Sequence, residues 1–424
     1  MSFADTLPDN VRRRSRLYAI ASALFGCISE WVNDSNAIII LFLVMLGGSE
    51  SFSLFSSSFA GLSTVFLGML AAMVAGWIGL RGTYRISVLV GTLMFFLMAL
   101  APYFGANAKY VVIIGALCYN MARPLYVATW YPMCGNMLRS NERASFFSTM
   151  RFCYMIQNTI LLYLAGRFMG DEPQQWKFQV ILVFAGIMAL GRIFCMDRMP
   201  VDKSEEKYGH NFLKSLASLY NEHGVVGYAF YLLAVYTCST GQLPLCIIYM
   251  KSGLSFGAGT IMSITSCRLC GMIIGFVTVR YATRIWNVLK YQFITHLLIV
   301  AVSLAVLFVR PDSAHNAILM GAIFFFSGMA YAHIMCLSSM RTLELAPADN
   351  RVVAMSFCSV MQSIGTVIST LGATILLASG ALSPKWSVFG IEFSHFHFMF
   401  ILYFLLCLFS MLFLILVPGQ RKEN

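Results

Sequence analysis

Apolar segments recur along the whole chain, and short polar segments separate them. The apolar segments are continuous rather than alternating with polar residues, and they reach the roughly 20 residues that a helix needs to cross a bilayer core. Continuous segments of this length favour α-helices over the alternating strands of a membrane barrel. We therefore expect twelve membrane-spanning helices, over residues 17–46, 54–79, 86–105, 110–135, 144–168, 178–197, 224–249, 256–279, 286–309, 316–339, 352–380 and 395–417.

The longest polar interruption follows the sixth expected helix and contains the run DRMPVDKSEEKYGHN. It predicts an N-terminal six-helix bundle (residues 1–197), a cytoplasmic linker (198–223) and a C-terminal six-helix bundle (224–424). The expected fold class is an all-α membrane protein with two bundles.

Composition agrees with a membrane location. Of the 424 residues, 59% are hydrophobic and 11% are charged, whereas soluble domains carry roughly 25% charged residues. The net charge of +11 is compatible with a nucleic-acid partner, but no basic patch with interleaved aromatic residues accompanies it. The sequence therefore predicts an integral protein of the lipid bilayer without a nucleic-acid partner.

The distribution of Lys and Arg predicts the orientation. If the N-terminus is cytoplasmic, 19 of the 29 Lys and Arg residues fall in cytoplasmic segments, against six in segments on the other side. Arg192 joins the cytoplasmic set if its side chain extends from the end of the sixth helix to the interface. This bias places both termini in the cytoplasm, and we expect a multi-pass protein of the plasma (bacterial inner) membrane.

Twelve cysteines lie almost entirely within apolar segments. Only Cys267 and Cys270 have the CxxC spacing, and they fall inside an expected helix with no His beside them. Packing is the expected role of such side chains, so the sequence predicts no metal site and no cofactor.

Two decapeptides share one spacing of glycine and arginine. GWIGLRGTYR (76–85) and GFVTVRYATR (275–284) fall between the second and third and between the eighth and ninth expected helices. SNERAS (140–145) and ADNRVVA (348–354) likewise open the fifth and eleventh helices. The expected gating residues are those of the two decapeptides: Gly76, Arg81, Arg85, Gly275, Arg280 and Arg284.

Over essentially its whole length the chain resembles the major facilitator superfamily, in which a GxxxDRxGRR-like motif occupies these two turns. The resemblance implies two pseudo-symmetric bundles that rock about a central cavity, lined by helices 1, 4, 7 and 10 with contributions from 2, 5, 8 and 11. The acid of the motif is replaced by Leu80 and Val279. We expect the motif arginines to pair instead with Glu142, Asp349 or helix C-termini; the alternative is that they only determine topology.

Six ionisable side chains fall near the middle of helices that the resemblance places along the cavity. A charge there costs roughly 2.5–3.5 kcal/mol on insertion scales and usually marks a pathway or a partner. The expected substrate-binding residues are the arginines and the expected coupling residues are the two acids and the histidine: Arg123, Arg151 and Arg268, and Glu30, Asp34 and His333. The alternatives are a structural ion network, an arginine satisfied by backbone carbonyls, and a hydrogen-bonded packing histidine.

Helical spacing adds polar and aromatic candidates. Tyr119, Arg123, Tyr126 and Trp130 form one stripe, because neighbours on a helix face recur at three and four residues. A guanidinium flanked by aromatic rings suits an anionic or π-rich ligand; packing between helices is the alternative. The remaining substrate-binding candidates lie on helices 5, 7 and 11: Tyr154, Asn158, Gln242 and Gln362.

The resemblance implies a secondary transporter, which we expect to be a monomer, and these residues favour a small organic anion or zwitterion as its substrate. Arg binds carboxylates and phosphates bidentately, and a buried acid can carry a proton, so coupling to protons or another ion is expected. The sequence shows no P-loop, HExxH or nucleophile-elbow pattern at a plausible site, and enzymatic activity is not expected.

Two other functions stay open. One is a drug or metabolite efflux antiporter, although helix 5 lacks the GxxxGPxxGG-like run that such antiporters of the superfamily often carry. The other is a non-transporting receptor or lipid-handling protein, although the longest polar segment, residues 198–223, is short for an output domain.

Overall fold

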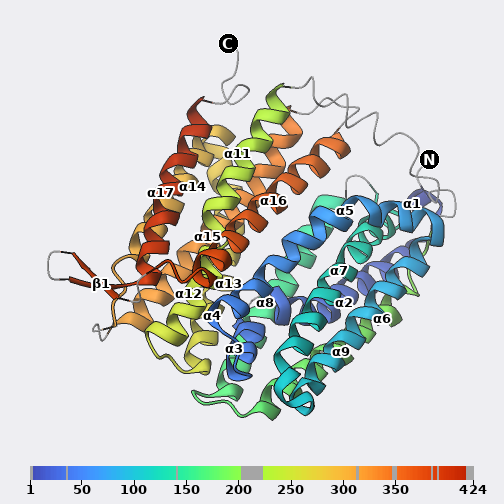
Figure 1. Cartoon of the computed structure of the whole chain (residues 1–424). Helices are drawn as coiled ribbons and strands as arrows, with labels where there is room; N and C mark the ends of the chain where they lie inside the picture. Colours follow the sequence, from blue (N-terminus) through green and yellow to red (C-terminus); the bar gives the residue numbers. More distant parts are fainter. Residues whose placement is uncertain are drawn as a thin grey trace. The chain divides into compact units, whose positions relative to one another are not determined.

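The structure is a computed structural model of the chain, and almost all of its elements are helices (Figure 1). It describes residues 3–34, 37–139, 142–201, 223–311, 315–345, 351–382, 385–388 and 391–416. Most of the predicted linker (198–223) and Asp349 therefore lie outside the described residues.

The first half of the chain forms helices at or close to every expected position. They are α1 (Phe3–Thr6), α2 (Asp9–Asp34), α3 (Ala37–Met45), α4 (Glu50–Phe55), η1 (Ser56–Ser58), α5 (Phe59–Ile78), α6 (Leu80–Leu100), η2 (Ala101–Asn107), α7 (Ala108–Gly135), α8 (Arg143–Met169) and α9 (Gln175–Met196).

The second half adds a short hairpin that the sequence did not predict. Its elements are α11 (His223–Ser239), α12 (Gln242–Ile248), the π-helix η4 (Tyr249–Gly253), α13 (Ala258–Ile285), α14 (Val288–Val306), α15 (Asn316–Leu345), α16 (Arg351–Ala378), β1 (Lys385–Val388), β2 (Ile391–Ser394) and α17 (His395–Leu416). The two strands pair antiparallel.

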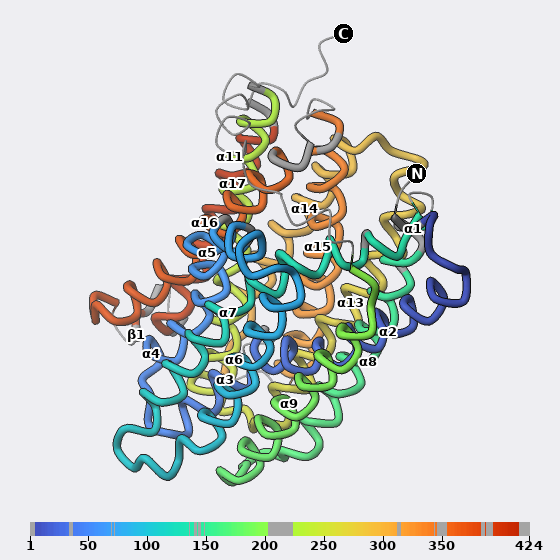
Figure 2. Tube along the Cα trace, turned by 90° about the vertical axis from the view of Figure 1, so that its right-hand side faces the viewer, coloured from blue at the N-terminus to red at the C-terminus, as the bar shows by residue number. Residues whose placement is uncertain are grey.

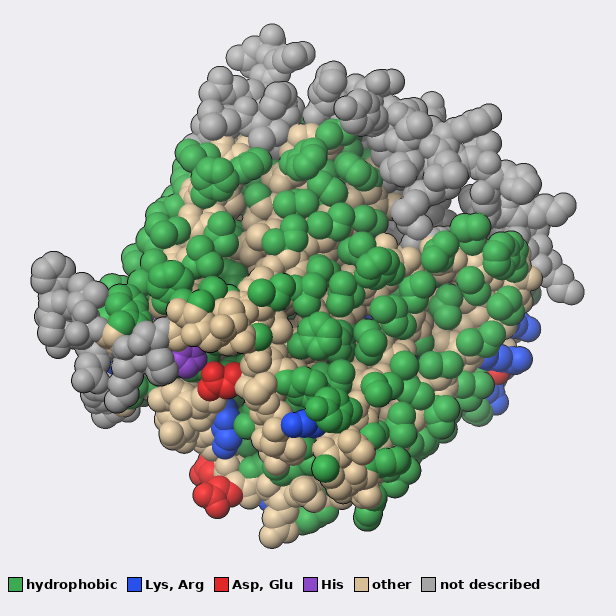
Figure 3. All heavy atoms as spheres, viewed as in Figure 1, with side chains coloured by type: hydrophobic (Ala, Val, Ile, Leu, Met, Phe, Trp, Pro, Cys, Tyr) green, Lys and Arg blue, Asp and Glu red, His purple; other side chains and the backbone are tan. Residues whose placement is uncertain are grey.

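Within the described residues, nine helical stretches are long and apolar enough to cross a membrane, and ten if α2 and α3 count as one bent span. The stretch Leu80–Cys134 holds both α6 and α7. Large hydrophobic side chains are also exposed, with Trp77 at 78% and Ile285 at 75%. Figure 3 shows such side chains covering much of one face, where charged groups are sparse. Lipid contact explains this surface, since soluble proteins rarely expose large contiguous apolar patches.

The helices form two compact units. In the first unit, α6 packs against α7 and α9, and α2 packs against α8 and α9. Its core includes Tyr84, Tyr126, Trp130 and Met133. In the second, α13 packs on α15, α11 on α16 and α17, and α14 on α15 (Figure 2).

The two units do not divide at a single point in the sequence. The second unit contains residues 211–424 together with Ser49–Gly61 and Gly170–Glu172, which the sequence analysis assigned to the N-terminal bundle. The reason is local contact: α4 packs against α16, and the N–H groups of Ala258 and Gly259 donate to the carbonyls of Asp171 and Gly170. These bonds satisfy donors that the start of α13 would otherwise leave free.

Candidate functional site

A buried ion pair joins α2 to α9 inside the first unit. Arg192 Nη2 lies 2.8 Å from Glu30 Oε1, and Arg192 is 7% exposed. The Arg192 guanidinium carbon also lies 3.8 Å from the centre of the Tyr126 ring on α7. Arg192 therefore does not join the cytoplasmic set of arginines, because a carboxylate and an aromatic face within the first unit replace the water that a guanidinium otherwise needs.

A small cavity lies beside this ion pair, within the first unit. Its volume is about 30 Å³, enough for one or two water molecules. Four helices, α2, α6, α7 and α9, line it, including two that the resemblance places outside the central cavity. The lining residues are Ser29, Glu30, Ser87, Val88, Gly91, Tyr119, Arg123, Tyr126, Ala189 and Arg192.

The aromatic stripe of α7 faces the interior of the first unit. Tyr119 packs edge-on against Phe95 of α6, with ring centres 4.8 Å apart, and Trp130 stacks on Tyr126. Tyr126 and Trp130 are each 6% exposed. This packing favours the structural alternative for Trp130, whereas Tyr119, Arg123 and Tyr126 also line the cavity. The side chain of Asp34 lies outside the described residues.

The candidates on α8 do not line this cavity. Arg151 is half-buried, Tyr154 packs against the core of the first unit, and Asn158 is 9% exposed. Their neighbour Gln157 donates a 2.8 Å hydrogen bond to the Leu24 carbonyl of α2. That bond holds α8 against α2.

Four further candidates belong to the second unit. Arg268 lies 5.1 Å from the ring centre of Tyr331, and Gln362 is half-buried on α16. Gln242 accepts a 2.9 Å hydrogen bond from Ser303. His333 Nε2 lies 2.8 Å from the Thr278 hydroxyl, and the Tyr291 hydroxyl also contacts its ring. These contacts favour the packing role for His333.

A second histidine lies in a hydrogen-bonded network that the sequence analysis did not identify. His296 on α14 is fully buried, with Nε2 3.0 Å from the Cys407 carbonyl and Nδ1 3.2 Å from the Tyr231 hydroxyl. A carbonyl only accepts hydrogen bonds, so Nε2 carries the proton and Nδ1 accepts from Tyr231. Gln292, His296 and Ser303 share one face of α14, and that polar spacing is the signal that could have revealed the network.

Comparison with known proteins identifies the family. A family model described as Major Facilitator Superfamily matches residues 23–370. The chain belongs to this superfamily. No curated protein sequence matches it.

Solved structures of superfamily transporters share the fold at low identity. A nucleoside transporter, NupG, has a TM-score of 0.71 at 11% identity, covering 98% of this chain and 100% of its own. A D-xylose–proton symporter has a TM-score of 0.73 at 14% identity, with 97% and 98% covered. A POT family transporter in complex with 5-aminolevulinic acid has a TM-score of 0.70 at 12% identity, with 96% and 97% covered. The family match and the apolar helices identify the chain as an integral, multi-pass membrane transporter of this superfamily.

In the first copy of the superfamily motif, the arginines pair with the segment after α9. The helix break lies at Gly79, whose φ of +82° favours glycine, and α6 already begins at Leu80 rather than at the expected residue 86. Arg85 binds Asp197 through two contacts of 3.0 Å, and Arg81 donates to the Met199 carbonyl at 3.1 Å. Asp197 therefore supplies the negative charge that Leu80 lacks.

The second copy does not lie in a turn, contrary to expectation. Residues 275–284 are all part of α13, which ends at Ile285, and Arg280 and Arg284 are exposed. Gly275 faces α15, where an added Cβ would lie 2.8 Å from the Met329 carbonyl oxygen. GMIIG (271–275) is a GxxxG spacing, which allows close helix contact, and this packing requirement explains Gly275.

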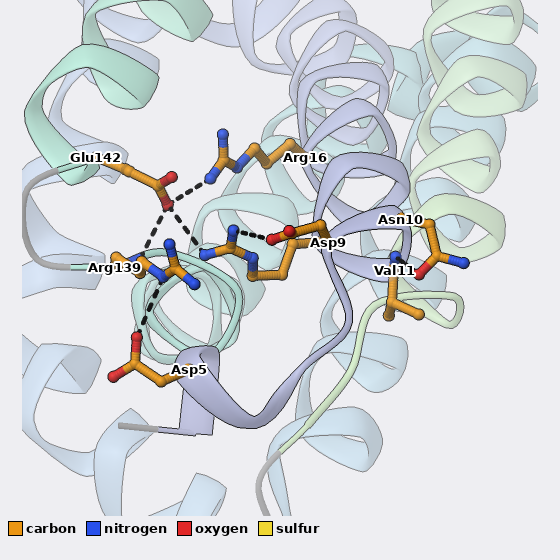
Figure 4. Close-up of polar contacts among 8 residues, drawn as sticks. Asp5, Asp9, Asn10, Val11, Arg16, Arg139 and Glu142 are labelled. Atoms are coloured by element: carbon orange, nitrogen blue, oxygen red, sulfur yellow. Dashed lines mark hydrogen bonds and ion pairs between the residues drawn. The ribbon is translucent and has the colours of Figure 1, made fainter. Parts of the chain in front are cut away.

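Glu142 does not pair with the motif arginines but with the start of α2 (Figure 4). It binds Arg16, lies 3.8 Å from Arg12, and accepts a 3.2 Å hydrogen bond from the backbone N–H of Arg139. Arg139 in turn binds Asp5 of α1 at 3.2 Å. This cluster fixes the N-terminal segment to the loop before α8, so the expected pairing of Glu142 with Arg81 or Arg85 is wrong.

The cluster should stabilise the fold in a pH-dependent way. The hydrogen bond from Arg16 holds the pKa of Glu142 below its usual value of 4.5, and Arg139 and Arg12 act in the same direction. Because the pKa of Glu142 is lower in the folded than in the unfolded state, its ionised carboxylate stabilises the fold at pH values above the unfolded-state pKa. This contribution disappears as the pH falls through the folded-state pKa. We expect Glu142→Gln to lower the unfolding free energy by about 0.5–1 kcal/mol at pH 7 and by almost nothing at pH 3.

Thermal unfolding of the purified protein between pH 3 and pH 7 measures this difference. Glu172→Gln is the matched control, because Glu172 is exposed and outside the cluster. A gap between wild type and Glu142→Gln that stays constant over this range would contradict the ionic role of Glu142.

Proposed function

We propose that the chain is a secondary active transporter for a small organic anion or zwitterion, driven by protons, in which Glu30 carries the proton. The observation that supports this most is the Glu30–Arg192 ion pair beside the cavity. Removing two charges from water is costly, and ionisable groups at membrane depth usually serve a pathway or a partner. A cell's plasma (bacterial inner) membrane supplies the proton gradient that such a carrier uses.

The arginines that line the cavity support the proposal that the transported solute is a small organic anion or zwitterion. Arg123 and Arg192 both line it, and a guanidinium binds a carboxylate or phosphate through two parallel hydrogen bonds. When Glu30 binds a proton, its attraction to Arg192 weakens, and the guanidinium becomes available to an anionic group. Proton uptake and solute binding then favour each other, which is the coupling that symport requires. The similarity to a D-xylose–proton symporter agrees with proton coupling.

Ligand screening followed by uptake tests the proposal. A panel of carboxylic acids, amino acids, nucleosides and sugars is added to the purified protein, and the compound that raises the unfolding temperature is the transport probe, since a bound ligand stabilises the native state. In proteoliposomes, an inward proton gradient should raise uptake of that probe at least tenfold in wild type. Glu30→Gln should lose this response and retain exchange of the probe.

Glu172→Gln is the matched control, because it removes an exposed carboxylate. Its uptake should respond to the gradient as wild type does. Gradient-driven accumulation by Glu30→Gln at the wild-type level would overturn the role of Glu30, and gradient-driven loss of the probe from the vesicles would indicate an antiporter.

A further inference from the structure

Arg192 reaches Glu30 by lying along one face of α2. Ser22, Gly26 and Glu30 recur every four residues and therefore share that face. Arg192 Nε donates to the Ser22 carbonyl oxygen at 3.5 Å, and Nη2 binds Glu30 Oε1 at 2.8 Å. The guanidinium thus lies over Gly26, between the Ser22 carbonyl and the Glu30 carboxylate.

Gly26 leaves the space that this path needs. A Cβ at position 26 would lie 1.6 Å from both Cζ and Nη2 of Arg192. The Tyr126 ring packs against the same guanidinium at 3.8 Å, which limits where the group can move. Any side chain at position 26 therefore requires the guanidinium to shift from its present position.

We propose that Gly26 is a positioning residue, which places the Arg192 guanidinium against Glu30 and so sets the pH at which Glu30 takes up a proton. The inference rests on the coupling role proposed for Glu30. A positive neighbour favours the ionised carboxylate, so the approach of Arg192, which Gly26 allows, controls how readily the proton binds.

Several other groups lie near Glu30 and also influence its proton affinity. Cys27 Sγ lies 3.8 Å from Glu30 Oε2 on the same helix, and α6 contributes Ser87, Val88 and Gly91, none of which titrates. The titratable or charged groups on the other helices are Arg123, Tyr119 and Tyr126 on α7, Tyr154 on α8 and Arg192 on α9. Gly26→Ala alters none of these groups chemically, so its effect reports the position of Arg192.

Infrared difference spectroscopy of the purified protein in lipid tests the inference without a transported solute. The carbonyl band of protonated Glu30 is the band that Glu30→Gln lacks, and its pH midpoint is followed in each variant. We expect Gly26→Ala to move the midpoint to higher pH by about one unit, a tenfold change in proton affinity. In an Arg192→Ala background, Gly26→Ala should cause no further change.

Gly191→Ala is the matched control, because Gly191 lies at the same contact of α2 and α9 but faces the Phe25 ring, 2.8 Å from an added Cβ. Its midpoint should stay within about 0.3 units of wild type, a change of about twofold. An unchanged midpoint in Gly26→Ala, or an equal shift without Arg192, would overturn the inference.

Unfolding measurements keep the inference testable if Gly26→Ala is too unstable to titrate. The destabilisation by Gly26→Ala should then disappear in the Arg192→Ala background, since coupled residues give non-additive effects. Additive effects would contradict it. Uptake that is independent of Glu30, together with the expected midpoint shift, would refute the proposed function and leave the role of Gly26 intact.

Discussion

Replacing Arg192 with alanine is expected to abolish gradient-driven uptake and to lower the unfolding free energy by about 3 kcal/mol. The variant leaves the Glu30 carboxylate within the first unit without the guanidinium that lies 2.8 Å away. The value is at the lower end of the range for a broken buried pair, because the Glu30 side chain is 23% exposed. Thermal or denaturant unfolding in lipid and uptake of the screened probe measure the two effects.

Two further variants separate stability from coupling. Glu30→Gln combined with Arg192→Gln removes both charges and should recover most of the lost stability, while gradient-driven uptake stays absent. Arg198→Ala is the control, because Arg198 is exposed beyond the end of α9 and donates to the Phe194 carbonyl rather than to a carboxylate. If Arg192→Ala were as stable as wild type, the Glu30–Arg192 ion pair would not contribute to the stability of the fold.

Gly271 is where the next largest loss of stability is expected, at the contact between α13 and α15. A Cβ there would lie 1.8 Å from the Phe325 carbonyl oxygen, and one at Gly328 would lie 2.0 Å from the Arg268 carbonyl oxygen. Both obstacles are backbone atoms, so a side chain must push the two helices apart. We expect Gly271→Ala to destabilise the protein by about 3 kcal/mol, the upper end of overpacking costs.

Gly372→Ala on α16 is the matched control, because nothing lies within 4 Å of an added Cβ there. In a helix interior, alanine is favoured over glycine by about 0.8–1.0 kcal/mol, so this control should be neutral or stabilised. The unfolding temperature and the fraction of monodisperse protein after purification report both variants. Equal stability of the two variants would contradict the close contact of α13 and α15.

Much of the fold could be predicted because helix position in a membrane protein depends on local composition. An apolar segment of sufficient length forms a helix whatever its neighbours are, since lipid offers no partners for free backbone groups. The starts of α8 at Arg143 and of α16 at Arg351 agree with the paired SNERAS and ADNRVVA segments. The end of α13 could not be predicted from the motif, because packing against α15 extends that helix through the second copy.

The sequence by itself determined the membrane class, the superfamily and the approximate positions of most helices, and it marked Glu30 as a charged residue within an apolar segment. The membrane class and the helix positions follow from local hydrophobicity, the superfamily from the resemblance of the motif-bearing segments, and the attention to Glu30 from the cost of a charge in lipid. Only the tertiary structure decided the ion-pair partners of these residues. Glu30 pairs with Arg192, which lies 162 residues further along the chain, and Arg85 pairs with Asp197. A helix face is defined by its own sequence, but the face that it meets depends on how all the helices of a unit pack. For that reason Arg192 looked like an interfacial residue in the sequence, and the structure places it beside Glu30 within the first unit.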